Sequence, residues 1–321
     1  MSLLSHCIVQ QHLALRRRPR QQHLFDIFYT SLQKKMAGLC WMAVTLSVLL
    51  YAGSSFADVD QNHLAGIVKE IVDKYRPSYK AGNVPRKPMF SLAVSIPYDE
   101  KSKKYDISQV FNTDPADTVK KTILKCEVYK GTRMVAATVL RWPDVLDQCP
   151  NEPVQWDDVL KECRNIKTWS HLDDTLTLLK DKGRKKSKSE KRCFDTVKEG
   201  RADHAEYRTL QAFNTLVDRK NKNDLLLFYV LASPCSQRCT GITKKWSILE
   251  NIKKIMKWKN YALVFSNVFK PRDGTPIPEK DSRGALERLG ESIGLKNIFR
   301  CDKDKCTSCS SGNQVTRECY T

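Results

Sequence analysis

One short stretch of this 321-residue chain restricts its fold more than any other. A His-x-Glu triplet at residues 204–206 is followed, after a 27-residue interval, by Pro234 and Cys235, and Cys239 comes four positions further on. Histidine nitrogens and cysteine thiolates are ligands that Zn²⁺ prefers, and three protein ligands leave one coordination position open for chemistry. The chain is therefore expected to fold so that His204, Cys235 and Cys239 converge on one zinc ion.

The residues between the two halves of this motif predict a helix followed by a buried strand. Residues 209–217 carry apolar side chains at helical spacing, whereas residues 225–231 form a short unbroken apolar run. One helix is expected to begin near His204 and a second near Cys235, with Pro234 at its first position. Helix N-termini favour negative charge, so both would stabilise hydroxide and thiolate at the metal.

Glu206 is the residue of the triplet that is expected to stay off the metal. Water bound to such a zinc ion ionises near neutral pH, which gives a zinc-bound hydroxide as nucleophile. A nearby carboxylate then moves protons from the water to a ring nitrogen and to the departing amine, as a general acid–base catalyst. This is the residue set of a zinc-dependent nucleobase deaminase, with Glu206 as proton shuttle. The alternative is that Cys235 and Cys239 belong to disulfides and that the triplet only begins a solvated helix.

The motif resembles that of the AID/APOBEC branch of the cytidine deaminase superfamily. The likeness rests on residues 204–206, on the 27-residue interval and on Ser-Pro-Cys at residues 233–235, and the three residues between the cysteines fall within the two to four that the family tolerates. Ala232 stands where the family often has Trp, and no match to its nucleotide-gripping loops is legible upstream. The resemblance covers residues 58–300, and only the central third has specific motifs. Within the family, the secreted AID/APOBEC-like deaminases are the members that this chain resembles.

The resemblance implies an α/β fold of three layers, a mixed five-stranded sheet with helices on both faces, with disulfide-rich decorations added here. Strands at residues 261–269 and 297–300, joined by a helix at 283–293, should run parallel. It also implies hydrolytic deamination of cytosine, as a free nucleoside or in single-stranded nucleic acid, because a base in a duplex would first have to be flipped out.

The segments ahead of the motif are less specific. Residues 60–75 have the apolar spacing of a helix, and an inserted, largely helical region is expected near residues 150–195. Three further segments are read as strands, the last two joined through Gly131 as a hairpin: residues 90–96, 124–129 and 134–140.

The N-terminal residues predict export from the cell. Residues 36–57 have a positive start, an apolar core and small residues before Asp58, which is the pattern of a cleaved signal peptide. Residues 1–35 are then an N-terminal extension, with either Met1 or Met36 as the true start. A retained signal anchor in a membrane is the alternative, although the apolar core is short for a spanning helix. The remaining boundaries are a deaminase-like domain at 58–300 and a Cys-rich tail at 301–321.

Cysteine usage agrees with an oxidising compartment. Apart from the leader and the two proposed ligands, eight cysteines are left, enough for four disulfides. They are Cys126, Cys149, Cys163, Cys193, Cys301, Cys306, Cys309 and Cys319. The four in the tail have a second interpretation, a structural zinc site.

The chain is strongly basic. Without residues 1–57 it keeps 49 basic and 35 acidic residues, a net charge of +14, and much of the excess lies in residues 180–192, which are read as an exposed flexible loop. A second group of lysines is interleaved with tryptophans on a helix expected after Cys239, the combination that binds single-stranded nucleic acid. The candidate nucleic-acid contacts are Arg184, Lys185, Lys186, Lys188, Lys244, Lys245 and Trp246.

Two further functions stay open at this point. A catalytically inactive deaminase-fold protein with a structural zinc would use the same charge to bind extracellular nucleic acid or other polyanionic surfaces. A toxin-like effector would act on an unrelated amide or amine. Glu206 separates the first from an enzyme, because a binding protein has no need of an unliganded carboxylate beside the metal.

Overall fold

A computed structural model describes residues 60–221, 223–243 and 245–321, which belong to one compact unit spanning 57–321. The predicted N-terminal extension and signal peptide, and the candidate contact Lys244, lie outside the described residues. In the part of the chain that is described, no helix has the length and apolar character needed to cross a membrane.

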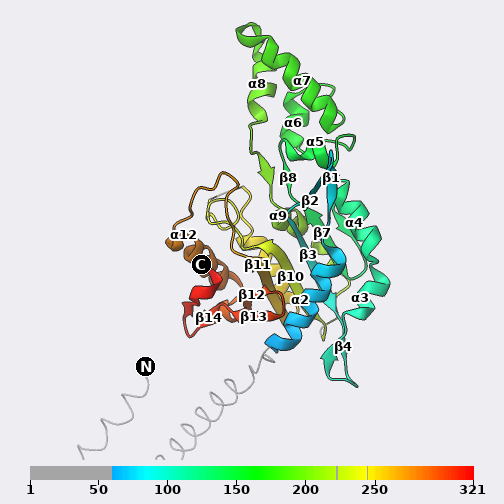
Figure 1. Cartoon of the computed structure of the whole chain (residues 1–321), viewed down its shortest axis with the longest axis vertical. Helices are drawn as coiled ribbons and strands as arrows, with labels where there is room; N and C mark the ends of the chain where they lie inside the picture. Colours follow the sequence, from blue (N-terminus) through cyan, green and yellow to red (C-terminus); the bar gives the residue numbers. More distant parts are fainter. Residues whose placement is uncertain (1–59, 222, 244) are drawn as a thin grey trace, which may run out of the picture. The chain divides into compact units, whose positions relative to one another are not determined.

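A mixed sheet forms the centre of the fold (Figure 1). In the described residues it has seven strands in the order β13-β12-β11-β10-β3-β7-β6. Strands β11 and β12 are parallel, as predicted, and β10 is parallel to β11 as well. The other pairs are antiparallel. The five central strands are among the six segments read as strands in the sequence, and a short strand at each edge brings the number above the predicted five. Their bounds are β3 Phe90–Ile96, β6 Tyr129–Lys130, β7 Met134–Thr138, β10 Leu225–Ala232, β11 Asn260–Asn267, β12 Ile298–Asp302 and β13 Lys305–Ser308.

Helices cover both faces of this sheet, which gives the three predicted layers. Alternate side chains of β10 point to opposite faces, so Leu225 and Leu227 enter one hydrophobic core while Leu226 and Phe228 enter another. The first core is closed by α2 Gln61–Tyr75, α3 Ser108–Thr113 and α4 Ala116–Leu124. The second is closed by α9 Ala205–Gln211, α10 Asn214–Val217, α11 Leu249–Ile252, η3 Lys253–Lys257 and α12 Glu279–Ile293. Burial on both faces explains why the central strands read as unbroken apolar runs.

Some elements differ from the sequence-based expectation. Residues 124–129 are not a strand, because α4 runs to Leu124 and only Tyr129–Lys130 pair with β7. The helix expected at 209–217 is divided between α9 and α10. The residues after Cys235 form a turn, and the expected helix begins only at α11.

A helical lobe projects from the sheet between β8 Leu140–Arg141 and β9 Ala202–Asp203 (Figure 1). It has a hydrophobic core of its own, built around Trp156, Trp169 and Leu172. Residues 180–192 are not a loop here, since they form the end of one helix, a short turn and the start of the next. The lobe contains α5 Asp144–Gln148, α6 Asp157–Glu162, α7 Trp169–Asp181, η2 Gly183–Lys185 and α8 Lys188–Thr196.

The eight cysteines set aside from the zinc motif form four disulfides, as predicted. The pairs are Cys126–Cys149, Cys163–Cys193, Cys301–Cys306 and Cys309–Cys319. The tail therefore offers no free thiolate for a second zinc ion, and that interpretation was wrong. The small strands and helices of the remaining loops are β1 Tyr79–Ala81, β2 Val84–Arg86, β4 Tyr98–Asp99, β5 Lys104–Tyr105, η4 Leu295–Asn297, β14 Ser310–Ser311, β15 Gln314–Val315 and η5 Arg317–Cys319.

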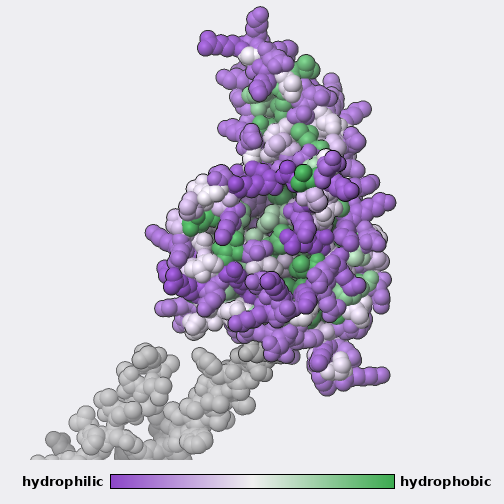
Figure 2. Space-filling model, in the orientation of Figure 1, coloured by the Kyte–Doolittle hydropathy of each residue, from purple (hydrophilic) through white to green (hydrophobic). Residues whose placement is uncertain are grey.

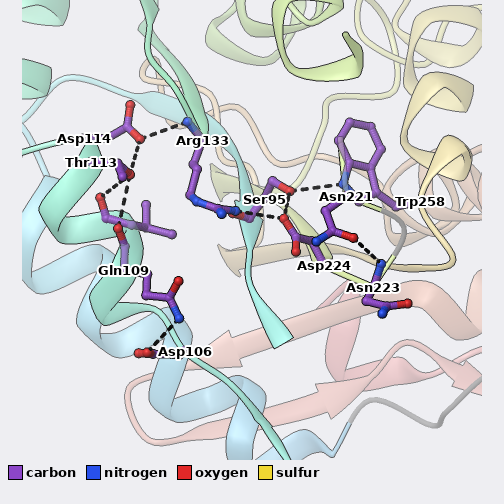
Figure 3. A network of polar contacts seen from close by, with 11 residues as sticks. Ser95, Asp106, Gln109, Thr113, Asp114, Arg133, Asn221, Asn223, Asp224 and Trp258 are labelled. Carbon is purple, nitrogen blue, oxygen red and sulfur yellow. Dashed lines mark hydrogen bonds and ion pairs between the residues drawn. The ribbon is translucent and has the colours of Figure 1, made fainter. Parts of the chain in front are cut away.

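A buried polar network joins the strands at one end of the sheet (Figure 3). Asp224, just before β10, accepts a hydrogen bond from Ser95 Oγ at 2.8 Å and pairs with Arg133 at 2.9 Å. Trp258 Nε1 in turn donates to Ser95 Oγ at 3.2 Å. The backbone N–H of Arg133 donates to Asp114, which is fully buried. These bonds satisfy two carboxylates inside the protein, where an unpaired charge is costly.

Candidate metal centre

His204 sits at the N-terminal end of α9, directly after β9. It is the N-cap residue, with extended backbone angles, so its side chain lies beside the free N–H groups of the first turn. The helix is fixed to the sheet by Thr209, whose hydroxyl lies 2.6 Å from that of Ser91 on β3. The sequence-predicted helix start at the triplet is thus found, and it turns His204 and Glu206 towards the end of β10.

The two cysteines lie on the turn that follows β10. The backbone N–H of Ser233 donates to Asn267 O at the end of the parallel strand β11, which fixes the direction of the chain as it leaves the sheet. The N–H of Thr240 then donates to Cys235 O at 3.1 Å and closes the turn. Both thiols are buried and unpaired with any other cysteine, so the interpretation of Cys235 and Cys239 as disulfide partners was wrong.

The three predicted ligands converge. His204 Nδ1 lies 2.9 Å from Cys239 Sγ and 3.8 Å from Cys235 Sγ, and the two sulfurs are 3.2 Å apart. All three atoms lie within 4.8 Å of one another. One nitrogen and two sulfurs at this spacing, in a buried position, fit a tetrahedral Zn²⁺ with bonds of about 2.0–2.3 Å. In the described residues this is the one group of three or more His, Cys, Asp or Glu side chains that could hold a metal ion.

Glu206 lies beside this group and is almost fully buried. Its Oε1 is 2.9 Å from Cys239 Sγ and 3.7 Å from His204 Nδ1. Burial alone would raise the pKa of this carboxyl, but the hydrogen bond and the charge of His204 outweigh it and hold the pKa below its usual value. A carboxylate at this position is within reach of a group bound at the metal.

Of the three proposed ligands, Cys235 is the one whose pKa is lowered. Hydrogen bonds from Cys239 and His204 lower the pKa of the Cys235 thiol to about 4 despite its burial. A thiolate is the form of cysteine that binds metal. The buried Cys239 thiol has a raised pKa beside the negative charges of Glu206 and Cys235, so zinc binding at Cys239 must displace its proton.

Asp203, which precedes His204, joins the lobe to the turn that carries the cysteines. Its Oδ2 accepts a hydrogen bond from Trp156 Nε1 at 3.1 Å and its Oδ1 accepts one from Trp246 Nε1 at 3.0 Å. Trp156 belongs to the lobe, whereas Trp246 belongs to the segment after Cys239. Nothing in the spacing of these residues along the sequence revealed this contact, and sequence reasoning missed Asp203 and Trp156.

Two arginines support the site from behind, and neither was predicted. Arg208 is buried on α9 and donates to Thr138 O at 2.5 Å and Cys126 O at 2.6 Å. Burial lowers its pKa to about 10. Arg288 on α12 donates to Thr240 O at 2.7 Å and so holds the cysteine turn. Arg208 lies four positions after His204, so the sequence alone places the two residues on the same side of a helix. No sequence signal connects Arg288 to the cysteine turn.

The candidate nucleic-acid contacts do not form one surface. Trp246 is half-buried and lies near the metal group through Asp203, and the exposed Lys245 lies beside it, with Nζ 5.8 Å from the indole centroid. The other described candidates, Arg184, Lys185, Lys186 and Lys188, lie where α7 meets α8, at the end of the lobe away from α9 (Figure 1).

A cavity of about 350 Å³ opens near α9 but does not include the metal group. Its lining includes Arg208, Gln155 and Lys130, and neither His204 nor Glu206 contributes to it. We therefore do not assign it to the chemistry of the zinc motif.

The three-layer fold and a His-Cys-Cys group with a buried glutamate at a helix N-terminus define a deaminase-like protein. The model of one family, described as Secreted Novel AID/APOBEC-like Deaminase 1, matches residues 157–321, just over half of the chain. The protein belongs to this family. The matched region begins at residue 157, whereas the expected resemblance began at residue 58, and it continues past residue 300 through the Cys-rich tail. Comparisons with curated proteins and with solved structures gave no match.

Proposed function

We propose that this protein is a zinc-dependent hydrolytic deaminase that acts on cytosine. The observation that carries the proposal is the convergence of His204, Cys235 and Cys239, with the carboxylate of Glu206 buried beside them. Zinc held by one imidazole and two thiolates lowers the pKa of water and supplies a nucleophile at neutral pH. Membership of a deaminase-like family supports the same chemistry.

Glu206 does the proton transfer in this proposal. It takes a proton from the attacking water, whose oxygen bonds to C4, and delivers that proton to N3 of cytosine. The proton that remains on the new C4 hydroxyl then passes through Glu206 to the amino group. The C4–N bond breaks, ammonia leaves, and the ring becomes uracil. Because Glu206 is buried, solvent screens its carboxylate little, and the electrostatic interaction of the carboxylate with the reacting atoms is stronger than in water.

We propose single-stranded nucleic acid, or a free cytosine nucleoside, as the substrate. The half-buried Trp246 lies next to the metal group, with the Arg238 guanidinium 6.0 Å and Lys245 Nζ 5.8 Å from its ring centroid. An aromatic ring with cations around it favours stacking of a base and pairing with a phosphate. Neither interaction needs a duplex.

The decisive experiment compares the wild type with Glu206→Gln, which keeps the size of the side chain and removes its basicity. The zinc-loaded wild type should convert cytosine to uracil in oligonucleotides or in cytidine. Glu206→Gln should bind zinc equally but lower kcat by about 10²–10⁴-fold. Glu291→Gln, on the exposed surface of α12, is the matched control and should leave kcat unchanged.

Two results would contradict the proposal, the first its activity and the second the role of Glu206. If zinc-loaded wild-type protein deaminates neither oligonucleotides nor cytidine, the proposal is wrong, and retained polyanion binding would favour a binding protein with a structural zinc. If Glu206→Gln is as active as the wild type, the proton transfer is assigned to the wrong residue.

We also propose that the protein is secreted and that its signal peptide, residues 36–57, is removed by cleavage before Asp58. The family description includes secretion, and four disulfides suit an oxidising compartment. Protein collected from the medium of expressing cells should begin at Asp58 by N-terminal sequencing. Recovery of the chain only in the membrane fraction, with residues 36–57 attached, would instead indicate a signal anchor.

A further inference from the structure

The lobe between β8 and β9 is a rigid unit that presents one end to solvent. Its own hydrophobic core includes Trp156, Trp169 and Leu172, all at most 2% exposed. The Cys163–Cys193 disulfide joins the end of α6 to α8, and Cys126–Cys149 fastens α5 to the body. The backbone at the free end of the lobe is therefore supported by a disulfide-bonded scaffold with its own core.

The free end of the lobe is strongly basic. Residues 180–192, which we call the lobe tip, contain eight basic and two acidic side chains. Figure 2 shows hydrophilic residues projecting from this end of the molecule. Although the tip is polar, part of it is helical, because Ser187 and Glu190 form a capping box that starts α8.

Only part of this positive charge is neutralised within the protein. Lys182 pairs with Glu190 at 2.6 Å and Arg192 pairs with Glu162 at 2.8 Å, while Lys186 lies over the ring of Phe194. Five further basic side chains of the tip are exposed and have no ion-pair partner among the described residues. They are Lys180, Arg184, Lys185, Lys188 and Lys191.

The tip lacks the features that a single-stranded nucleic acid would require. The tryptophans of the lobe are buried and Phe194 is half-buried beneath Lys186, so the tip itself, residues 180–192, offers no aromatic ring for a base to stack on. The tip also lies at the opposite end of the lobe from α9 and the metal group (Figure 1). Its charge is therefore not explained by substrate binding at the proposed active site.

We propose that the lobe tip is a binding surface for sulfated polysaccharide. Lysine ammonium groups act as compact point charges, which suit closely spaced sulfates that need no planar, bidentate recognition. Membership of a family described as secreted places such polymers among the polyanions that the protein meets. Five cations with no ion-pair partner among the described residues lie on a disulfide-bonded scaffold, so binding a polyanion orders little of the backbone.

The binding should be electrostatic and independent of catalysis. Cations that contact a polyanion release condensed counterions, so affinity falls steeply as salt rises. Because the tip is remote from Glu206, polysaccharide bound there leaves the proposed deamination of a free nucleoside unchanged. Polysaccharide binding at the tip does not require the protein to be an enzyme.

The test measures the Kd of the full secreted chain for a size-defined heparin oligosaccharide by calorimetry. In the tip variant Arg184, Lys185, Lys188 and Lys191 are each changed to Ala. A matched control removes the same charge from the body, at Lys253, Lys254, Lys257 and Lys259, each to Ala. At about 0.15 M NaCl the tip variant should bind at least about tenfold more weakly, and the control should change Kd by less than about threefold.

Further arms separate the tip from unfolding and from other ligands. Changing Lys185, Lys188 and Lys191 to Arg in place of Ala, with Arg184 kept, preserves the charge and should preserve binding. Desulfated heparin should not bind the wild type. Equal losses in the tip variant and the control would overturn the proposal, because binding would then follow net charge alone. Tighter binding of duplex DNA than of heparin, lost in the tip variant, would also overturn it and assign the tip to nucleic acid.

Discussion

Asp203 Oδ1 accepts a hydrogen bond from Trp246 Nε1 at 3.0 Å, directly beside the proposed zinc ligand His204. The other oxygen of the same carboxylate accepts from Trp156 in the lobe. One side chain thus connects the segment that follows the cysteine turn and the lobe to the start of α9. The inserted lobe is therefore coupled to the metal centre, although its tip is remote from it.

Asp203→Asn should weaken this connection, because an amide has one oxygen acceptor in place of two. One indole N–H loses its partner, at a cost of about 1 kcal/mol in a half-buried setting. We expect kcat/KM for a cytosine oligonucleotide to fall by about fivefold with zinc content unchanged. Trp246→Phe, which removes the same donor, should give a similar loss that is not additive with it. Additive losses would show that the two residues act separately.

Cys239→Ser should abolish zinc binding. The thiolate supplies one of three protein ligands, and a neutral hydroxyl replaces it poorly. Zinc per chain, measured by atomic emission after gel filtration, should fall from about one to near zero. The double variant Cys163→Ala, Cys193→Ala is the control, because its disulfide lies in the lobe and its zinc content should not change. Full zinc content in Cys239→Ser would refute the proposed ligand set.

Gly131→Ala should destabilise the fold. A Cβ at this position would overlap the Asp114 carboxylate and the ring of Tyr129, which leaves no room without moving the β6–β7 turn. The free energy of unfolding in urea should fall by about 1–3 kcal/mol. Gly66→Ala is the contrasting control, since Gly66 lies inside α2 with open space around it and alanine should add about 0.5–1 kcal/mol. Equal effects of the two substitutions would contradict this reading.

Asp224→Ala should also destabilise the protein. It leaves Arg133 without its partner and Ser95 without its acceptor at a position that is 2% exposed. We expect a loss of about 2–4 kcal/mol, below the full value for a buried pair because Arg133 reaches solvent. Asp218→Ala, at an exposed position, should change stability by less than about 0.5 kcal/mol. A comparable loss in both variants would indicate that the network adds no stability.

Much of the central architecture follows from local sequence patterns. The apolar run at residues 90–96 gave the bounds of β3, and the helix read at residues 60–75 is α2 within one residue. The even number of cysteines predicted the four disulfides but not their pairing. Local reasoning was wrong at 180–192, where charge suggested a loop although Ser187 and Glu190 carry a helix-capping signal.

By itself the sequence identified the residues that we propose as zinc ligands, because the ligand types and their spacing are fixed along the chain. It also determined the alternation of elements, since periodicity in apolar residues is a local property. Only the tertiary structure decided that Asp203 joins Trp156 to Trp246, that Arg288 holds the cysteine turn, and that the basic tip lies away from the metal. These contacts join residues far apart in the chain, and their formation depends on how the whole core packs rather than on any neighbouring residue.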